Sequence, residues 1–203
     1  MMRRFDGDKL LIATHNAGKL EEMQALFAPS GVAVVSSGML GLPEPEETES
    51  TFLGNARIKA HSAARATGLI ALGDDSGLEV DALGGEPGVY TANWAETPEG
   101  RDFAMAMDKV HQAILATGTA EPWRGRFRCT LVLAWPDGHE EVFEGAAEGR
   151  LIWPVRGVQG HGFDPMFVPE GEQRTFAEMP HDEKNRISHR ARAISALMAH
   201  CFT

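Results

Sequence analysis

The chain has 203 residues, of which 43% are hydrophobic and 24% charged, proportions typical of a folded globular protein and not of a disordered or fibrous one. This length fits one domain, so we expect a single domain over residues 1–203. The net charge of −10 argues against general affinity for nucleic acid polymers or anionic membranes, which rely on excess Lys and Arg. A phosphate ligand would therefore need a divalent cation or a local cluster of basic side chains.

The two cysteines, Cys129 and Cys201, lie far apart and lack the C-x-x-C spacing of a zinc or redox motif, which fits a reducing, cytoplasmic location. The apolar run 10–13 near the N-terminus is too short for the core of a signal peptide. The longest apolar stretch, 131–135, falls far short of the about 20 residues that a membrane-spanning helix needs. We therefore expect a soluble, untargeted protein.

The first part of the chain alternates strand and helix patterns. Residues 9–14 predict a short buried strand, and a turn follows at 15–18. After an acidic, Pro-containing loop at 42–50, the Ala-rich segment 52–67 predicts a helix that ends at Gly68, a residue type common just after helices. Between the turn and the loop, apolar side chains recur at helical spacing: Leu20, Met23, Leu26 and Phe27.

The middle of the chain contains an acidic segment between two strand patterns. Residues 69–72 predict a strand, Gly73-Asp74-Asp75-Ser76-Gly77 is expected to break it, and 78–83 resumes as a strand. Segment 99–117 predicts a helix that ends at Gly118. Its apolar side chains share one face: Phe103, Met107, Val110 and Ile114.

The last part predicts a hairpin and a terminal helix. Two β-rich runs, 127–135 and 140–144, flank the turn tripeptide Pro136-Asp137-Gly138. Because strands and helices interleave throughout, we predict an α/β fold, and the hairpin makes its sheet mixed. The terminal helix is expected to pack four side chains inward: Ile187, Ala191, Ile194 and Met198.

The turn Thr14-His15-Asn16-Ala17-Gly18-Lys19 is the first candidate site. A strand end here delivers a hydroxyl, a carboxamide and an ammonium group to a helix N-terminus, where free N–H groups and the helix dipole attract anions. The spacing is not that of a P-loop, since Leu20 follows the lysine. An ordinary turn capped by Asn16 explains the same residues equally well.

Two acidic segments are the second candidate. Clustered carboxylates can hold Mg²⁺ together with water and a substrate phosphate. For the Glu residues of 44–49, a solvated acidic loop is the simpler interpretation. Asp74 and Asp75 follow an apolar strand directly, and adjacent carboxylates near a buried sheet edge require a cation. We favour a functional role for this pair.

Two further segments complete the candidate set. Gly160-His161-Gly162-Phe163-Asp164-Pro165 combines a flexible backbone with planar side chains, which suits a base-stacking pocket, although a surface loop fits as well. Lys184, His189 and Arg190 could clamp phosphate oxygens or donate hydrogen bonds to a base carbonyl, and a solvated helix face is the alternative.

Taken in order, these motifs resemble one family, the inosine/xanthosine triphosphate pyrophosphatases, also called dITP/XTP pyrophosphatases or HAM1-like proteins. The resemblance covers nearly the whole chain from Lys9 to the last helix, and the ordered set is more specific than any single motif. It rests on Thr14 to Lys19, Glu46-Glu47-Thr48, Thr51-Phe52, Asn55-Ala56, Asp74 to Leu78, Pro87 to Tyr90, Gly162 to Pro165, Lys184 and Ser188-His189-Arg190.

The resemblance implies an elongated central mixed β-sheet flanked by helices, with two lobes around a substrate cleft, and a homodimer. It implies Mg²⁺-dependent hydrolysis of non-canonical purine nucleoside triphosphates (dITP, ITP, XTP) to the monophosphate and pyrophosphate, which cleanses the nucleotide pool. Donors aimed at the O6 atom would select a 6-oxo purine over adenine, because an unpaired buried donor costs about 1–3 kcal/mol.

The resemblance also carries residue roles. Asp75 resembles the family's general base, and it resembles a metal-binding carboxylate together with Glu46. Asp74 and Glu47 are expected as neighbours in the metal shell. The expected substrate contacts are Thr14, His15, Asn16, Ala17, Gly18, Lys19, Lys59, Ser76, His161, Gly162, Phe163, Asp164, Lys184, His189 and Arg190.

Two residues depart from the family's common pattern. His15 stands where glycine is frequent, and His161 stands where a stacking phenylalanine is frequent. A histidine ring still stacks, and its charged form attracts phosphate, so we expect retained activity with a pH-dependent base affinity.

Three other functions remain open at this point. A Maf-like nucleotide pyrophosphatase would act on pyrimidine or modified nucleotides instead. A nucleotide sensor without turnover would use the same residues, although binding alone needs no general base at Asp75. An α/β scaffold without a ligand would leave the ordered motifs unexplained.

Overall fold

The computed structural model describes residues 3–202, and these divide into two compact units, each with its own core. Unit 1 comprises 3–75, 129–145 and 190–202, and unit 2 comprises 76–128 and 146–189. Within 3–202, none of the helices combines the length and the apolar character needed to traverse a bilayer.

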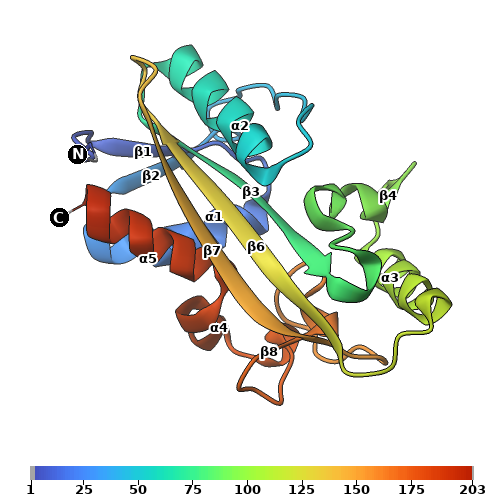
Figure 1. Ribbon diagram of the computed structural model, residues 1–203. Helices are drawn as coiled ribbons and strands as arrows, with labels where there is room; N and C mark the ends of the chain where they lie inside the picture. The colour runs from blue at the N-terminus through green and yellow to red at the C-terminus, as the bar shows by residue number, and fades with distance from the viewer. Residues whose placement is uncertain (1–2, 203) are drawn as a thin grey trace. The chain divides into compact units, whose positions relative to one another are not determined.

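A mixed sheet runs through the described part of the chain. β1 pairs in parallel with both β2 and β3, whereas β8 is antiparallel to β7. The predicted mixed α/β fold is therefore confirmed. The six strands follow the order β2 (Ala33–Ser36), β1 (Lys9–Ile12), β3 (Ala71–Val80), β6 (Trp123–Ala134), β7 (Glu140–Leu151) and β8 (Phe167–Pro169) (Figure 1).

In unit 1, helices cover both faces of the sheet. Side chains alternate along β1, so that Leu10 and Ile12 pack with α1 (Ala17–Phe27) and α5 (His189–Cys201), whereas Leu11 packs on the other face against α2 (Phe52–Thr67). In Figure 1, α2 lies on one side of these strands, and α1 and α5 lie on the other.

The predicted second helix is confirmed at both ends. α2 spans Phe52–Thr67, with Thr51 as its N-cap accepting a hydrogen bond from the Gly54 N–H. Gly68 ends the helix at φ 70°, the left-handed conformation that glycine adopts without steric cost. Small side chains let this helix approach the sheet closely, because Ala56, Ala60 and Ala64 are fully buried.

Unit 2 is built around α3 (Phe103–Thr117). The predicted apolar face is confirmed, since Met107, Val110 and Ile114 pack into one core with residues of β3, β6, β7 and β8. The helix begins four residues later than predicted, because Asp102 caps it by accepting a hydrogen bond from the Met105 N–H. Unit 2 also contains β4 (Glu96–Thr97), β5 (Gly100–Arg101) and α4 (His181–Ile187).

The predicted break of the third strand is wrong. β3 runs without interruption through Gly73-Asp74-Asp75-Ser76-Gly77. Gly73 is not a turn residue: a Cβ there would collide with the Ala56 carbonyl oxygen of α2, so the glycine allows close packing. The Asp74 carboxylate is tolerated in the strand because Lys19 and Arg190 neutralise it.

The predicted single terminal helix is also wrong. α4 and α5 are separate helices, divided at Ser188, whose backbone is extended at φ −68° and ψ 158°. Ile187 consequently packs in the unit 2 core, whereas Ile194 packs in the unit 1 core. A continuous helical pattern in the sequence concealed this change of partner.

The predicted hairpin is longer than its sequence pattern. β6 and β7 extend to Trp123 and Leu151, and the turn closes with a hydrogen bond of 2.9 Å from the Trp135 N–H to the His139 carbonyl. The sequence pattern missed β2 and β8, which are short strands without strong alternation.

Candidate functional site

The turn between β1 and α1 presents a helix N-terminus. Asn16 is the N-cap of α1, and its side-chain oxygen accepts a hydrogen bond of 2.9 Å from the Lys19 N–H. The hydroxyl of Thr14 accepts one of 3.1 Å from the Asn16 N–H. His15, Asn16 and Ala17 are exposed, so this end of the helix is accessible to an anion.

Lys19 reaches from this turn to the adjacent strand β3. Its ammonium nitrogen lies 2.7 Å from Asp74 Oδ1, and its side chain stays 28% exposed. Parallel pairing of β1 with β3 explains the contact, because Ile12 at the end of β1 pairs with Leu72, and Asp74 follows two residues later, next to the turn. Lys19 can therefore hold Asp74 and still face a ligand.

Asp74 is buried among opposite charges. Arg190 Nε lies 2.8 Å from its Oδ2, and Arg190 Nη1 lies 2.6 Å from Glu22 Oε2. Burial alone would raise the pKa of the Asp74 carboxyl, but the charges of Arg190 and Lys19 outweigh it and hold this pKa well below its ordinary value. Asp74 is therefore a stable carboxylate.

Asp75 lies beside a second cation, Lys59 of α2. The Lys59 ammonium is 3.0 Å from Asp75 Oδ1 and 2.9 Å from Glu47 Oε1, and it also donates to the Asp74 carbonyl at 3.0 Å. Asn55 donates to Asp75 Oδ2 at 3.4 Å. One cation therefore holds a carboxylate of the acidic loop against a carboxylate of β3.

The two members of this ion pair differ in their electrostatics. Burial raises the pKa of the Asp75 carboxyl; the opposing charges of Lys59 and Lys19 do not cancel this effect, and Glu47 adds to it. For Lys59, burial disfavours the charged form, but the carboxylates of Asp75 and Glu47 raise its pKa overall. Asp75 thus has the higher proton affinity that suits a general base.

The sequence predicts two carboxylates of the acidic loop near the metal, those of Glu46 and Glu47. Both residues are exposed, and Glu47, expected as a neighbour in the metal shell, pairs with Lys59. Within residues 3–202, no group of three or more His, Cys, Asp or Glu side chains is placed to hold a metal ion. Mg²⁺ commonly takes only one or two carboxylates and fills its octahedron with water and phosphate oxygens. Asp75 and Glu47 supply such a pair.

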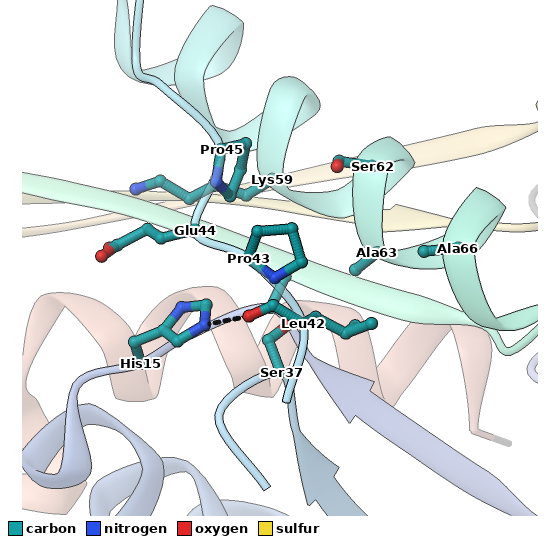
Figure 2. A pocket seen from close by; sticks show the side chains of 11 residues that line it. His15, Ser37, Leu42, Pro43, Glu44, Pro45, Lys59, Ser62, Ala63 and Ala66 are labelled. Carbon is teal, nitrogen blue, oxygen red and sulfur yellow. Dashed lines mark hydrogen bonds between the residues drawn. The ribbon is translucent and has the colours of Figure 1, made fainter. Parts of the chain in front are cut away.

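A pocket of about 50 Å³ opens in unit 1 beside these residues (Figure 2). His15 donates from Nε2 to the Leu42 carbonyl at 2.7 Å and so ties the turn to the acidic loop. The lining residues are Ala13, His15, Ser37, Leu42, Pro43, Glu44, Pro45, Lys59, Ser62, Ala63 and Ala66.

Unit 2 organises its own polar cluster around Asp164. This buried carboxylate accepts a hydrogen bond of 2.6 Å from the His161 N–H and an ion-paired one of 2.7 Å from Lys184 Nζ. Gly160 must be glycine, because a Cβ would strike Asp164 Oδ2 and its φ is 77°. Asp164 therefore fixes both the glycine loop and the Lys184 ammonium.

The aromatic residues of unit 2 divide between surface and core. Phe163 is 1% exposed and meets Phe103 edge to face at 5.8 Å, whereas His161 is exposed on the loop. His189 is buried and stacks on Phe127 at 4.9 Å. Of the two rings predicted for the base pocket, only His161 offers an accessible face.

The structure groups the predicted site residues within the units. Unit 1 gathers the turn 14–19 with Lys59, Asp75 and Arg190, and unit 2 holds Ser76, the loop 161–164, Lys184 and His189. Sequence reasoning assigned no site role to Glu22 or Asn55, although Asn55 belongs to a motif that carries the resemblance. Helical spacing is a signal that indicates both, since Glu22 lies three residues after Lys19, and Asn55 lies four residues before Lys59.

Comparisons with known proteins agree over the whole chain. The sequence profile of the Ham1 family matches residues 10–200. A dITP/XTP pyrophosphatase of Ruegeria pomeroyi is 66% identical over 202 residues, which cover 100% of this chain and 99% of that protein. One of Gluconobacter oxydans is 52% identical, covering 99% and 95%. The solved structure of a HAM1 protein from Coxiella burnetii aligns with a TM-score of 0.85 at 36% identity, covering 94% of this chain and 96% of that one. The chain therefore belongs to the Ham1 family.

Proposed function

We propose that the chain is a nucleoside triphosphate pyrophosphatase that hydrolyses non-canonical purine nucleotides, namely dITP, ITP and XTP, to the monophosphate and pyrophosphate. This reaction would remove such nucleotides from the pool available for nucleic acid synthesis. The observation that carries the proposal is the pair of carboxylates, Asp75 and Glu47, held on one ammonium group beside a helix N-terminus. Family membership and the names of the relatives support it.

Mg²⁺ is the proposed cofactor, and the donor set fits it. Asp75 and Glu47 offer hard oxygen atoms around a position that already accommodates a cationic group, the Lys59 ammonium. Glu46 is adjacent in sequence and remains a candidate ligand. When bound, the ion would neutralise phosphate oxygens and favour deprotonation of an attacking water.

The residues of unit 1 then have distinct roles. The N-terminus of α1 and the Lys19 ammonium would hold the polyphosphate through N–H groups and charge. Asp75 would accept a proton from the attacking water and orient it in line with the phosphorus. Lys59 would keep Asp75 and the acidic loop in place, since it contacts both.

The residues of unit 2 would recognise the base. His161 offers an exposed ring for stacking, and Lys184 offers an ammonium whose orientation Asp164 fixes. A 6-oxo purine presents a carbonyl to such donors, whereas adenine presents an amino group and leaves them unpaired. Each unpaired buried donor costs about 1–3 kcal/mol, so a few of them would exclude adenine effectively.

A panel of nucleoside triphosphates tests this function. We expect pyrophosphate release from dITP, ITP and XTP with Mg²⁺, much slower release from dATP, dUTP and dTTP, and none in EDTA. Preference for dUTP or dTTP would instead indicate a Maf-like activity. Turnover that survives EDTA would contradict the metal requirement.

The variant Asp75→Asn distinguishes an enzyme from a sensor. It keeps the shape of the side chain but removes the base, so we expect turnover to fall by at least about 10²-fold while dITP binding, measured by calorimetry, persists. Equal turnover in the variant and the unsubstituted chain would remove Asp75 as the base.

Sedimentation of the same samples would test the homodimer that the resemblance implies.

A further inference from the structure

Four charged side chains of unit 1 form a network of three consecutive ion pairs with alternating sign. Glu22 contacts Arg190 at 2.6 Å, Arg190 contacts Asp74 at 2.8 Å, and Asp74 contacts Lys19 at 2.7 Å. Lys19 and Glu22, the two ends of this network, both belong to α1 and are three residues apart. α5 supplies Arg190, and β3 supplies Asp74.

Exposure singles out one member of this network. The side chains of Asp74, Arg190 and Glu22 are 2%, 5% and 9% exposed, whereas that of Lys19 is 28% exposed. A ligand in solution therefore meets Lys19 and not the other three. The Arg190 guanidinium is already engaged with two carboxylates, through Nε and Nη1.

From this geometry we infer that Arg190 is a positioning residue, which acts on the polyphosphate through Asp74 and Lys19. Its guanidinium holds Glu22 through Nη1 and Asp74 through Nε, and this planar group fixes the direction of the contact with Asp74 as well as its charge. Asp74 Oδ1 in turn fixes the Lys19 ammonium beside the N-terminus of α1. The inference rests on the proposed function for the identity of the substrate, but the network itself is defined by the contacts.

A merely stabilising role and a direct contact with the nucleotide base are the two alternatives. Stabilisation alone would leave the ligand affinity of the folded protein unchanged. Direct base contact would leave the affinity for a ligand without a base unchanged. Inorganic pyrophosphate is therefore the informative probe, because it carries the phosphate groups and lacks the base and sugar.

The experiment is a double-mutant cycle with Arg190→Lys, Lys19→Met and the combined variant. We expect Arg190→Lys to weaken the binding of inorganic pyrophosphate by roughly tenfold, the size of one charge-assisted hydrogen bond. The affinity is measured by calorimetric titration with Mg²⁺ present. The variant should raise the KM for dITP by a similar factor and change kcat less. In the Lys19→Met background, Arg190→Lys should add less than about twofold, since its route to the ligand is then absent.

Matched variants keep the cycle interpretable. Glu22→Gln loosens the far end of the network without removing Arg190 or Asp74, so we expect it to weaken pyrophosphate binding less than Arg190→Lys does. It replaces Arg190→Lys in the cycle if that variant does not fold. Arg65→Lys makes the same chemical change at an exposed position of α2 and should leave pyrophosphate affinity unchanged. Urea denaturation of each variant establishes that the measured protein is folded.

Several results would overturn the inference. One is a combined variant whose loss of pyrophosphate affinity equals the product of the losses in the two single variants, because the two residues would then act independently. Others are an Arg190→Lys effect on dITP but not on pyrophosphate, and unchanged affinity in folded Arg190→Lys. Absence of pyrophosphate binding to the unsubstituted chain would also remove it. If dITP is not hydrolysed but the pyrophosphate cycle behaves as expected, the proposed function fails and the network stands.

Discussion

Asp74 is a carboxylate in the middle of a strand, and it is more deeply buried than most charged side chains. Its environment explains why a charge is tolerated there. Removing one partner of a buried ion pair typically costs about 3–5 kcal/mol, because the remaining charge loses its compensation without regaining water. The network around Asp74 therefore couples the stability of unit 1 to the placement of Lys19.

The pH dependence of stability should report this carboxylate. Burial alone would raise the pKa of the Asp74 carboxyl, but the charges of Arg190 and Lys19 lower it in the folded state. A lowered pKa stabilises the fold above the unfolded-state value of about 3.9, and the contribution is lost as pH falls towards the folded-state pKa. Urea denaturation gives the free energy of unfolding of the unsubstituted chain and of Asp74→Asn. The gap between these two free energies should be constant from about pH 7 to 5 and shrink below about pH 4. A gap that stays constant to pH 3, or that shrinks above pH 5, would contradict this assignment.

At the residue scale, sequence alone located more than it explained. The pattern placed Lys19, Asp74 and Asp75 in candidate segments, because a turn after a strand and adjacent carboxylates are visible in one dimension. It could not pair Glu22 with Arg190, which are 168 residues apart, since such a contact depends on the packing of α1 and α5 on one face. Nor could it show that Glu47 pairs with Lys59, since this contact depends on how the acidic loop folds against α2.

At the scale of elements, the contact of α2 with β3 carries Lys59 to Asp75. This contact needs Gly73, because a Cβ there would meet the Ala56 carbonyl and would lie 2.9 Å from the Ala60 nitrogen. The backbone of a helix cannot move aside as the end of a flexible side chain can.

Gly73→Ala should therefore destabilise the chain by about 1–3 kcal/mol, the range for overpacking a well-filled core. Gly38→Ala is the matched control, since its Cβ would meet the nearest atoms only at 3.8 Å and it should change the free energy of unfolding by less than about 0.5 kcal/mol. Urea denaturation measures both. Equal stability of the two variants would show that the close approach at Gly73 is not limiting.

Elements were predictable where local signals were complete. α2 has an N-cap threonine, an Ala-rich body and a terminal glycine, and its predicted bounds are correct. The error in β3 arose because glycine and aspartate favour turns locally, whereas here one packs against a helix and the other is neutralised by distant cations. The division at Ser188 has the same origin, since Ile187 and Ile194 belong to different cores.

At the scale of the whole molecule, the net charge of −10 opposes a polyanionic ligand. The sequence predicted that local basic residues, a divalent cation or both must overcome this field. In unit 1 the three cations Lys19, Lys59 and Arg190 are matched by four carboxylates, those of Glu22, Glu47, Asp74 and Asp75. In unit 2, Lys184 is matched by Asp164. These clusters orient charge but supply no positive excess.

Binding of a polyphosphate should therefore depend on a divalent cation even without turnover. We expect inorganic pyrophosphate to bind at least about tenfold more weakly in EDTA than in Mg²⁺, because the uncompensated carboxylates then face the anion directly. Glu47→Gln removes one of these charges while keeping the side-chain length, so it should narrow the difference in pyrophosphate affinity between EDTA and Mg²⁺. The control Glu99→Gln, at an exposed position of unit 2, should leave this difference unchanged. Calorimetric titration at constant ionic strength separates this effect from general screening. Equal affinity in EDTA and Mg²⁺ would mean that Lys19 and the N-terminus of α1 overcome the negative field unaided.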